Sequence, residues 1–365
     1  MARIVYSCCG EGQGHSSRTL TMVRALRRQG HEVLVLAARK AFEVLHPKTE
    51  SVEEIPGLLI VYKNNQVQPL STLRGNWPMM RDKKKIVSRL VTRLKEFRPD
   101  LAVVDFEPFL PLAAKQMNLP WISIDHQHVI PHMSPKVPMA KWIEQLSCAF
   151  VILQTHVGEH ANLVTSFYQP DEPHPADVHF LPPILRDEVL KLKPENTGHV
   201  VVYQTSTSFT RLPELLKTLP YRFHIYAFDQ TGTDDNLTYF PRKNEGFIED
   251  VAKADWIFTN GGYTLMSESL FLNKPVFSVP VQGQFEQWIN GYYLEKLGYG
   301  MMCTNPQEIP ARLTSFVQQL DTYRGNLKGK DFFGNERAIK SILRYVDQHD
   351  PRMDKPIPEP ALKPE

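Results

Sequence analysis

The chain has 365 residues, of which 42% are hydrophobic and 22% charged, and this length and composition are typical of a globular protein of about two domains. We find no apolar run near the roughly 18 residues of a membrane-spanning helix, and no signal peptide is expected, because MARIVYS enters a predicted strand at once. The formal net charge of +2 gives no whole-chain argument for a nucleic-acid partner.

The first predicted unit is a strand, a glycine-rich loop, a helix and a second strand. The strand ARIVYS is followed by GEGQGH (10–15), and SRTLTMVRALRRQ (17–29) carries apolar residues at helical spacing. Gly30 is expected to end this helix, and EVLVLAA (32–38) has the continuous apolar character of a buried parallel strand. This order is typical of a βαβ unit.

The glycine loop does not match a nucleotide-binding signature. A phosphate-binding loop ends in Gly-Lys-Ser/Thr, which this sequence does not contain, and the third glycine comes one residue too early for a dinucleotide fold. Arg39 and Lys40 suit a 2′-phosphate, so NADP binding stays open as an alternative. A loop that only turns the chain explains Gly12 and Gly14, but not His15 at its end.

His15 is a candidate general base. A neutral histidine at a helix N-terminus can accept a proton from a hydroxyl, and the helix end disfavours the charged form of the ring. Asp105 ends the predicted strand LAVVD and is the candidate to orient the ring. Asp125 and His126, at the end of the next strand PWISID (120–125), are the alternatives.

Composition predicts the domain limits. AFVILQT (149–155) is expected to be a further strand of the first domain. The five expected segments are a first α/β domain (1–180), a linker rich in Pro and charge (181–198), a second α/β domain (199–334), an amphipathic helix near the interdomain region (335–349) and a Pro-rich tail (350–365).

The four cysteines indicate neither a metal site nor a set of disulfides. Their spacing matches neither a zinc site nor a disulfide pattern, so buried thiols in a reducing cytoplasm are expected. They are Cys8, Cys9, Cys148 and Cys303.

The second half repeats the strand signal. Because ligands bind beyond the carboxyl ends of parallel strands, two such sheets facing each other predict a ligand cleft between them. The strands are expected in HVVVYQTS (199–206), RFHIYAF (222–228), ADWIFTNGG (254–262) and KPVFSVPV (274–281).

The most informative stretch runs from 246 to 300. The turn Asn260–Gly262 follows a strand and precedes a helix that is expected to start at Tyr263 or Thr264, which makes an anion site suited to a diphosphate. Glu268, about one turn into this helix, can accept hydrogen bonds from two ribose hydroxyls. The polar loop QGQFEQ (282–287) suits the hydroxyls of a sugar.

These motifs together resemble the GT-B glycosyltransferases. The donor segment, the glycine loop with His15 and the strand end LAVVDFEP are similar to those of the peptidoglycan UDP-GlcNAc transferase and of the UDP-glucuronosyl and plant UDP-glucosyl transferases. The likeness covers most of the chain and is greatest to a bacterial and archaeal subgroup that carries the DFEP motif. It implies an α/β protein with two Rossmann-like domains whose mostly parallel sheets face each other across a cleft.

The resemblance also implies roles for matching positions. His15 and Asp105 fall where plant members carry their base and its orienting acid, with Gly12 and Gly14 in the acceptor-side loop. The implied donor residues are Thr205 to Ser208 (Thr205 and Ser206 foremost) for a phosphate, Phe247 and Ile248 for the base, Asn260, Gly261, Gly262, Tyr263 and Thr264 for the diphosphate, Glu268 for the ribose, and Glu286 and Gln287 for the sugar.

Two departures leave the donor sugar open. Asn260 stands where the plant signature has His, and Glu286, followed by Asn290, stands where the family has Asp. These positions do not change the expected fold.

The resemblance implies an inverting transfer of a hexose from a nucleotide sugar, a UDP-sugar foremost, to an acceptor hydroxyl in the cytoplasm, in a role connected with cell-surface polysaccharide. No cofactor and no metal are expected, and the acid pair Asp234-Asp235 lacks a D-x-D spacing. A UDP-sugar 2-epimerase of the same architecture, a non-catalytic sugar-nucleotide-binding protein and an NADP oxidoreductase stay open as alternatives.

The sequence contains fewer motifs that indicate the acceptor substrate. The segment 70–97 is basic and carries Trp77, Met79 and Met80, a pattern that can rest on an anionic membrane surface. In that case the acceptor is lipid-linked and the protein is peripheral at the inner face of the membrane. The alternative is a solvated helix beside an acceptor loop.

Overall fold

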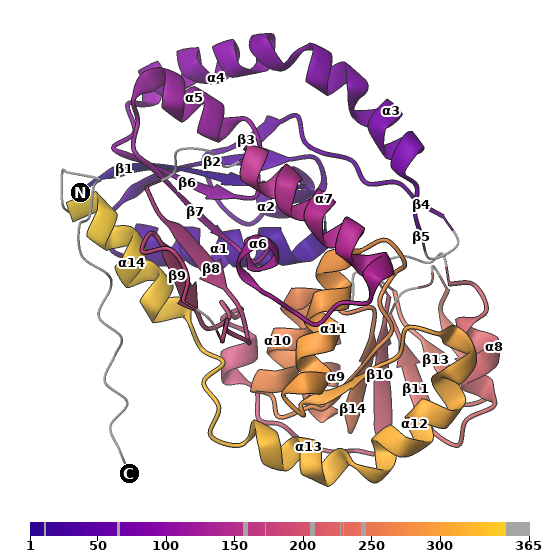
Figure 1. The fold of residues 1–365 in the computed structure, drawn as a ribbon. Helices are drawn as coiled ribbons and strands as arrows, with labels where there is room; N and C mark the ends of the chain where they lie inside the picture. The colour runs from indigo at the N-terminus through magenta and orange to yellow at the C-terminus, as the bar shows by residue number, and fades with distance from the viewer. Residues whose placement is uncertain are drawn as a thin grey trace.

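The computed structural model describes residues 1–10, 12–63, 66–155, 160–171, 173–204, 209–226, 228, 230–241 and 246–347. Within these residues the chain forms two sheets of seven strands each, both flanked by helices, and a two-stranded hairpin (Figure 1). This confirms the predicted α/β class with two mostly parallel sheets.

The first sheet has the strand order β3-β2-β1-β6-β7-β8-β9, and all its neighbouring strands are parallel. Its central strands are short and buried on both faces, as strands between two helix layers must be. The strands are β1 Arg3–Cys8, β2 Glu32–Ala38, β3 Val52–Ile55, β6 Leu101–Asp105, β7 Trp121–Asp125, β8 Asn162–Thr165 and β9 Val178–Leu181.

Helices and the hairpin complete this half. They are α1 Gly12–Arg28, α2 Lys40–Leu45, hairpin strands β4 Tyr62–Lys63 and β5 Gln66–Val67, α3 Pro69–Arg81, α4 Lys83–Phe97, α5 Leu110–Met117, α6 Val129–His132 and α7 Met139–Thr155.

The second sheet has the order β12-β13-β11-β10-β14-β15-β16 and is parallel except for the β12–β13 pair. Its strands are β10 His199–Tyr203, β11 Arg222–Ile225, β12 Gly232–Asp234, β13 Leu237–Tyr239, β14 Trp256–Thr259, β15 Val276–Ser278 and β16 Gly300–Met302. Its helices are α8 Leu212–Lys217, α9 Phe247–Lys253, α10 Tyr263–Phe271, α11 Phe285–Lys296, α12 Ile309–Gln318 and α13 Leu320–Leu327, with short 3₁₀ turns at Val189–Lys191 and Pro306–Glu308.

The last helix, α14 (Asn335–Asp347), returns to the first half of the chain and packs against α1 and β6 (Figure 1). Ala338, Ile342 and Tyr345 pack into the core under the first sheet. At the start of α14, the Asn335 side chain exchanges two hydrogen bonds of 2.8 Å with the backbone of Leu185. The chain therefore crosses between the sheets twice, and this amide fastens the two crossings together.

One predicted strand is wrong. The run AFVILQT (149–155) is the last part of α7, and β8 extends the sheet in its place. A short apolar run fits a buried strand and a buried helix equally well, so the pattern alone does not distinguish them. The first helix also begins earlier than expected, at Gly12, so that Gly14 and His15 lie in its first turn.

Two further observations concern membrane-spanning helices and the cysteines. None of the described helices is long and apolar enough to cross a membrane. The four cysteines all lie in the described ranges and are free thiols, three of them buried and Cys148 partly buried.

Gly261 provides a test of the turn before α10. Its φ of +94° is unfavourable for other residues, and a Cβ there would lie 2.8 Å from the carbonyl oxygen of Gln287 and 2.9 Å from Oγ of Ser278. We predict that Gly261→Ala lowers the free energy of unfolding by about 1–3 kcal/mol, measured by urea denaturation. Gly325→Ala is the control, because Gly325 lies in α13 with open space around it, and this change should add about 0.5–1 kcal/mol. Equal stability of the two variants would contradict the requirement for glycine at position 261.

Candidate functional site

The predicted catalytic pair meets at the carboxyl end of the first sheet. His15 lies in the first turn of α1, and Asp105 is the last residue of β6. Nδ1 of His15 lies 2.6 Å from Oδ1 of Asp105, the carboxylate is fully buried, and His15 is 8% exposed. With Nδ1–H donating to the carboxylate, Nε2 carries the lone pair, which is the tautomer that a general base requires.

Arg18 joins this pair, although it was not among the residues predicted from the sequence. It follows His15 by one helical turn and is 4% exposed. Its Nε donates to Oδ2 of Asp105 at 2.9 Å and its Nη2 to Oδ1 at 2.6 Å. Burial opposes the charge of this guanidinium, but the Asp105 carboxylate outweighs it and raises the pKa of Arg18. The available signal was the spacing, since residues i and i+3 share a helix face.

The residues after Asp105 shape the end of β6. Phe106 has a φ of 51°, in the left-handed region that non-glycine residues seldom adopt, and its ring lies parallel to that of His15 at 6.4 Å. The buried carboxylate of Glu107 accepts hydrogen bonds from the backbone N–H groups of Phe109 (2.7 Å) and Leu110 (2.8 Å). Burial raises the pKa of Glu107 to about 7, against the effect of these bonds. The DFEP motif thus joins β6 to the start of α5.

A line of polar contacts leads from His15 into the second half of the chain. Nε2 of Gln127 lies 3.3 Å from Nε2 of His15 and donates to Oε2 of Glu286 at 3.1 Å. Gln127 follows β7, and Glu286 lies in the first turn of α11. The Gln127 amide therefore stands where an acceptor hydroxyl would have to lie in order to donate to His15.

The two alternative partners predicted for His15, Asp125 and His126, form hydrogen bonds with other residues. The Asp125 carboxylate accepts hydrogen bonds from the backbone N–H of His128 at 3.0 Å and from its Nδ1 at 2.8 Å. His126 joins the two halves: its Nδ1 lies 2.8 Å from the carbonyl oxygen of Thr165, and its Nε2 lies 2.7 Å from Oδ1 of Asn290. Burial lowers the pKa of His126. Asp105, not Asp125, is therefore the acid beside His15.

The first turns of α1 and α10 also meet at this interface. The ring of Tyr263, the first residue of α10, stacks on His126 at 3.7 Å. A Cβ on Gly14 would collide with the hydroxyl of Thr264, so this close approach requires glycine at position 14. Gly12, at the start of α1, has a φ of +72°.

Asn260 ties strand ends together at the start of the predicted diphosphate turn. Its buried Nδ2 donates to Oε1 of Gln204 at 2.8 Å and to the carbonyl oxygen of Val279 at 3.1 Å. The side chain thereby joins the residues that follow β10, β14 and β15. Gly261 and Gly262 then lead into the N-terminus of α10, where backbone N–H groups favour an anion.

Glu268 has a partner that was not predicted. Its buried carboxylate accepts hydrogen bonds of 2.6 and 2.5 Å from the guanidinium of Arg186, which lies in the segment between the two sheets. Burial opposes the charge of Arg186, but Glu268 outweighs it and raises the pKa of Arg186. A ribose at Glu268 would therefore have to share or displace these bonds.

The other predicted donor residues lie around the same sheet edge. Phe247 and Ile248 begin α9, with Ile248 buried in the core. The side chain of Gln287 accepts a hydrogen bond from the backbone N–H of Val281 at 3.0 Å and so holds its own loop. Thr205 and Ser206, with the rest of the predicted phosphate loop, lie outside the described residues.

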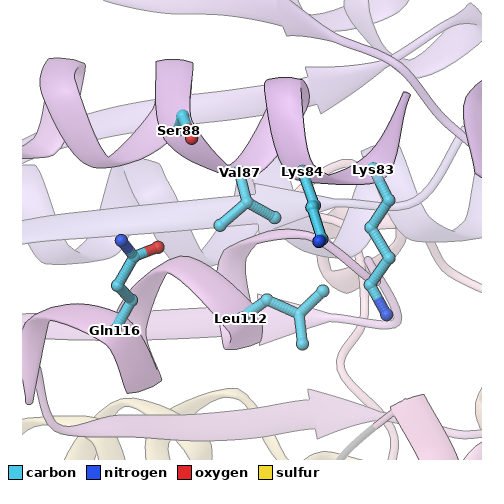
Figure 2. A pocket seen from close by; sticks show the side chains of 6 residues that line it. All are labelled: Lys83, Lys84, Val87, Ser88, Leu112 and Gln116. Carbon is cyan, nitrogen blue, oxygen red and sulfur yellow. The ribbon is translucent and has the colours of Figure 1, made fainter. Parts of the chain in front are cut away.

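A separate hollow of about 530 Å³ lies between α4 and α5 (Figure 2). The lining of this hollow contains none of the predicted site residues. The candidate site is placed instead at the interface between the two halves, where the contacts of His15, Gln127 and Glu286 lie. The hollow is lined by Lys83, Lys84, Val87, Ser88, Leu112 and Gln116.

Comparison with known proteins gives a consistent result. Residues 2–321 match the family described as glycosyl transferase family 1. The chain is 24% identical to an uncharacterized glycosyltransferase of Methanosarcina acetivorans, over 93% of this chain and 97% of the relative. Among solved structures it resembles the calicheamicin glycosyltransferase CalG4 (TM-score 0.67, 16% identity, 95% and 99% coverage). It also resembles SsfS6 of Streptomyces sp. SF2575 complexed with thymidine diphosphate (TM-score 0.59, 17% identity, 94% and 100% coverage).

The buried Arg18–Asp105 pair is testable by stability. We predict that Arg18→Met lowers the free energy of unfolding by about 3–5 kcal/mol in urea denaturation, because it removes one partner of a buried ion pair. Arg28→Met on the same helix is the control: Arg28 pairs with Asp187 at 2.9 Å, but its side chain is 65% exposed, and the expected loss is below about 1 kcal/mol. A similar loss in both variants would show that Arg18 does not hold Asp105 as described.

Proposed function

The chain belongs to glycosyl transferase family 1, and from that premise we propose that this GT-B glycosyltransferase transfers a hexose from a UDP-sugar to an acceptor hydroxyl, with inversion at the anomeric carbon. The observation that carries the proposal is the line of contacts His15–Gln127–Glu286, which supports a base and a sugar-binding acid on opposite sides of one reacting centre. We assign acceptor binding to residues 1–180 and donor binding to residues 199–334.

In the proposed reaction, Nε2 of His15 takes the proton of the acceptor hydroxyl. The oxygen then attacks the anomeric carbon in line, while the bond from that carbon to the diphosphate oxygen breaks and the nucleoside diphosphate leaves with the electron pair. Asp105 stabilises the imidazolium, and the two hydrogen bonds from Arg18 hold the Asp105 carboxylate in its orientation.

The leaving group is stabilised by the N-terminus of α10, whose backbone N–H groups and dipole favour negative charge. Glu286 and Gln287 hold the sugar and Glu268 holds the ribose, once the nucleotide has shared or displaced the bonds of Arg186. The proposal requires no metal ion and no cofactor. Because SsfS6 is complexed with thymidine diphosphate, dTDP-sugars are the second class of donor to test.

The experiment compares the wild-type chain with His15→Ala. A panel of UDP- and dTDP-hexoses is mixed with hydroxyl acceptors, and released nucleoside diphosphate is measured. His15→Ala should lower turnover by about 10²–10⁴-fold, because general-base assistance is lost. The stabilisation by UDP in a thermal melt, about 2.7 kcal/mol at a hundred times its dissociation constant, should be retained.

The exposed His46→Ala on the same half is the control and should keep full turnover. Equal turnover of His15→Ala and wild type would remove His15 from the mechanism. Epimerised hexose without an acceptor, or nucleotide binding without turnover, would replace the transferase by an epimerase or a binding protein.

We further propose that the acceptor is lipid-linked and that the protein contacts an anionic membrane surface. Leu70, Leu73 and Trp77 are exposed and follow a helical spacing on α3, and the start of α4 adds Lys83, Lys84 and Lys85. An apolar stripe beside a basic cluster suits anionic lipid headgroups. A second exposed apolar set lies on α7: Met139, Trp142, Ile143 and Leu146.

Co-sedimentation with phosphatidylcholine vesicles of increasing phosphatidylglycerol content tests this contact. The bound fraction should rise with anionic lipid and fall with salt. The double change Leu73→Ser and Trp77→Ser should abolish most of the binding, whereas Leu297→Ser, an exposed apolar residue of the second half, should not. Binding that ignores anionic lipid would contradict the proposal.

A further inference from the structure

The side chain of Gln127 lies between the candidate base and the second half of the chain. Its amide nitrogen lies 3.3 Å from Nε2 of His15 and 3.1 Å from Oε2 of Glu286. The contact is sheltered from solvent, because Gln127 is 7% exposed and His15 is 8% exposed. A single amide therefore covers the proton-accepting nitrogen of His15 and also contacts the candidate sugar-binding carboxylate.

The two neighbours of this amide determine its orientation. With Nδ1–H of His15 donating to Asp105, Nε2 of His15 carries a lone pair and is an acceptor, and the Glu286 carboxylate is also an acceptor. The NH₂ group of Gln127 offers one N–H to each of them, whereas the amide turned by 180° would place its oxygen against two acceptors. Both N–H groups are therefore engaged, one in each half of the chain.

The oxygen of the same amide is less well accommodated. Oε1 of Gln127 is buried and has no hydrogen-bond partner among the described residues. A buried polar atom without a partner disfavours the conformation that holds it. When the side chain turns toward water, Oε1 gains the hydrogen bonds that it lacks in the covering position. This gain offsets part of the loss of the two N–H contacts, so the amide is displaceable.

The backbone at Gln127 is held on both sides. Nδ1 of His126 lies 2.8 Å from the carbonyl oxygen of Thr165, and the backbone N–H of His128 donates to Oδ1 of Asp125 at 3.0 Å. A change of the Gln127 rotamer is therefore sufficient to uncover His15, and the strand end need not move.

Water and an acceptor compete with the amide on unequal terms. A hydroxyl of either molecule can donate to Nε2 of His15, as the Gln127 amide does. A water molecule brings no other contact with which to displace the amide, whereas an acceptor adds the binding energy of its remaining surface. The acceptor therefore displaces the amide much more readily than water does.

We propose that Gln127 suppresses hydrolysis of the donor by covering His15 until an acceptor displaces the amide. This inference rests on the proposed function, in which His15 is the base. In the suppressed reaction, a proton of water passes to Nε2 of His15 and the water oxygen bonds to the anomeric carbon. The bond from that carbon to the diphosphate oxygen breaks, and the nucleoside diphosphate leaves with the electron pair. Gln127 thereby determines which nucleophile reacts.

The covering contact is tested first, without any donor or acceptor. Diethyl pyrocarbonate modifies accessible neutral imidazole nitrogens, and peptide mass spectrometry gives the rate at each histidine. In the wild-type chain His15 should react more slowly than the exposed His46. Gln127→Ala should raise the rate at His15 by about 3–10-fold, the factor that corresponds to the loss of one hydrogen bond. An unchanged rate at His15 in this variant would overturn the proposal.

The effect on the reaction is measured as nucleoside diphosphate released without an acceptor. The probes are UDP-glucose, UDP-N-acetylglucosamine and dTDP-glucose, and binding of each is checked by the melting temperature. Gln127→Ala should hydrolyse a bound donor about 10–100-fold faster than the wild type, because two hydrogen bonds that exclude water are lost. The double variant His15→Ala, Gln127→Ala should lose this increase. Gln116→Ala, which removes an exposed glutamine of α5, is the control and should hydrolyse the donor at the wild-type rate.

The readout is a gain of hydrolysis, which a merely damaged structure would not produce. No increase in Gln127→Ala with a donor that binds, or an increase that persists without His15, would overturn the inference and leave the proposed transfer in place. Failure of the wild-type chain to bind any of the three donors, or to transfer from them, would contradict the proposed function and with it this inference.

Discussion

The candidate site depends on a fully buried carboxylate, that of Asp105. A buried charge is tolerated only when it is paired and hydrogen-bonded, and here Arg18 supplies two hydrogen bonds and His15 a third. These bonds orient the imidazole, so that its second nitrogen points toward the other half of the chain. The ion pair that stabilises the end of β6 is thus also what makes His15 suitable as a base.

The second half also contains a buried carboxylate that must be paired and hydrogen-bonded. Glu268 is fully buried on α10, and Arg186, from the segment between the sheets, neutralises it with two hydrogen bonds. Because the partners come from the connecting segment and from the second half, this ion pair fixes how the second sheet follows the first. Gln127 connects the halves as well: its amide lies 3.3 Å from Nε2 of His15 and donates a hydrogen bond to Glu286.

Sequence patterns predicted the strand-loop-helix order, the two sheets and the pairing of His15 with Asp105, because these follow from local periodicity and from the rule that parallel strands end at one edge. They failed at AFVILQT, where a helix and a strand have the same apolar content. They also missed Arg18 and Arg186. An arginine on a helix or in a linker is usually exposed, and its burial becomes evident only when the opposing carboxylate is in place.

The sequence by itself determined the fold class and the chemical type of each candidate group, since periodicity, glycine turns and residue identity are local properties. The tertiary structure decided which groups meet: Asp105 rather than Asp125 beside His15, His126 as a bridge to Asn290, and Gln127 between His15 and Glu286. These partners lie on different strands and helices. Their meeting depends on strand order and on how the two halves pack, which residue spacing does not encode.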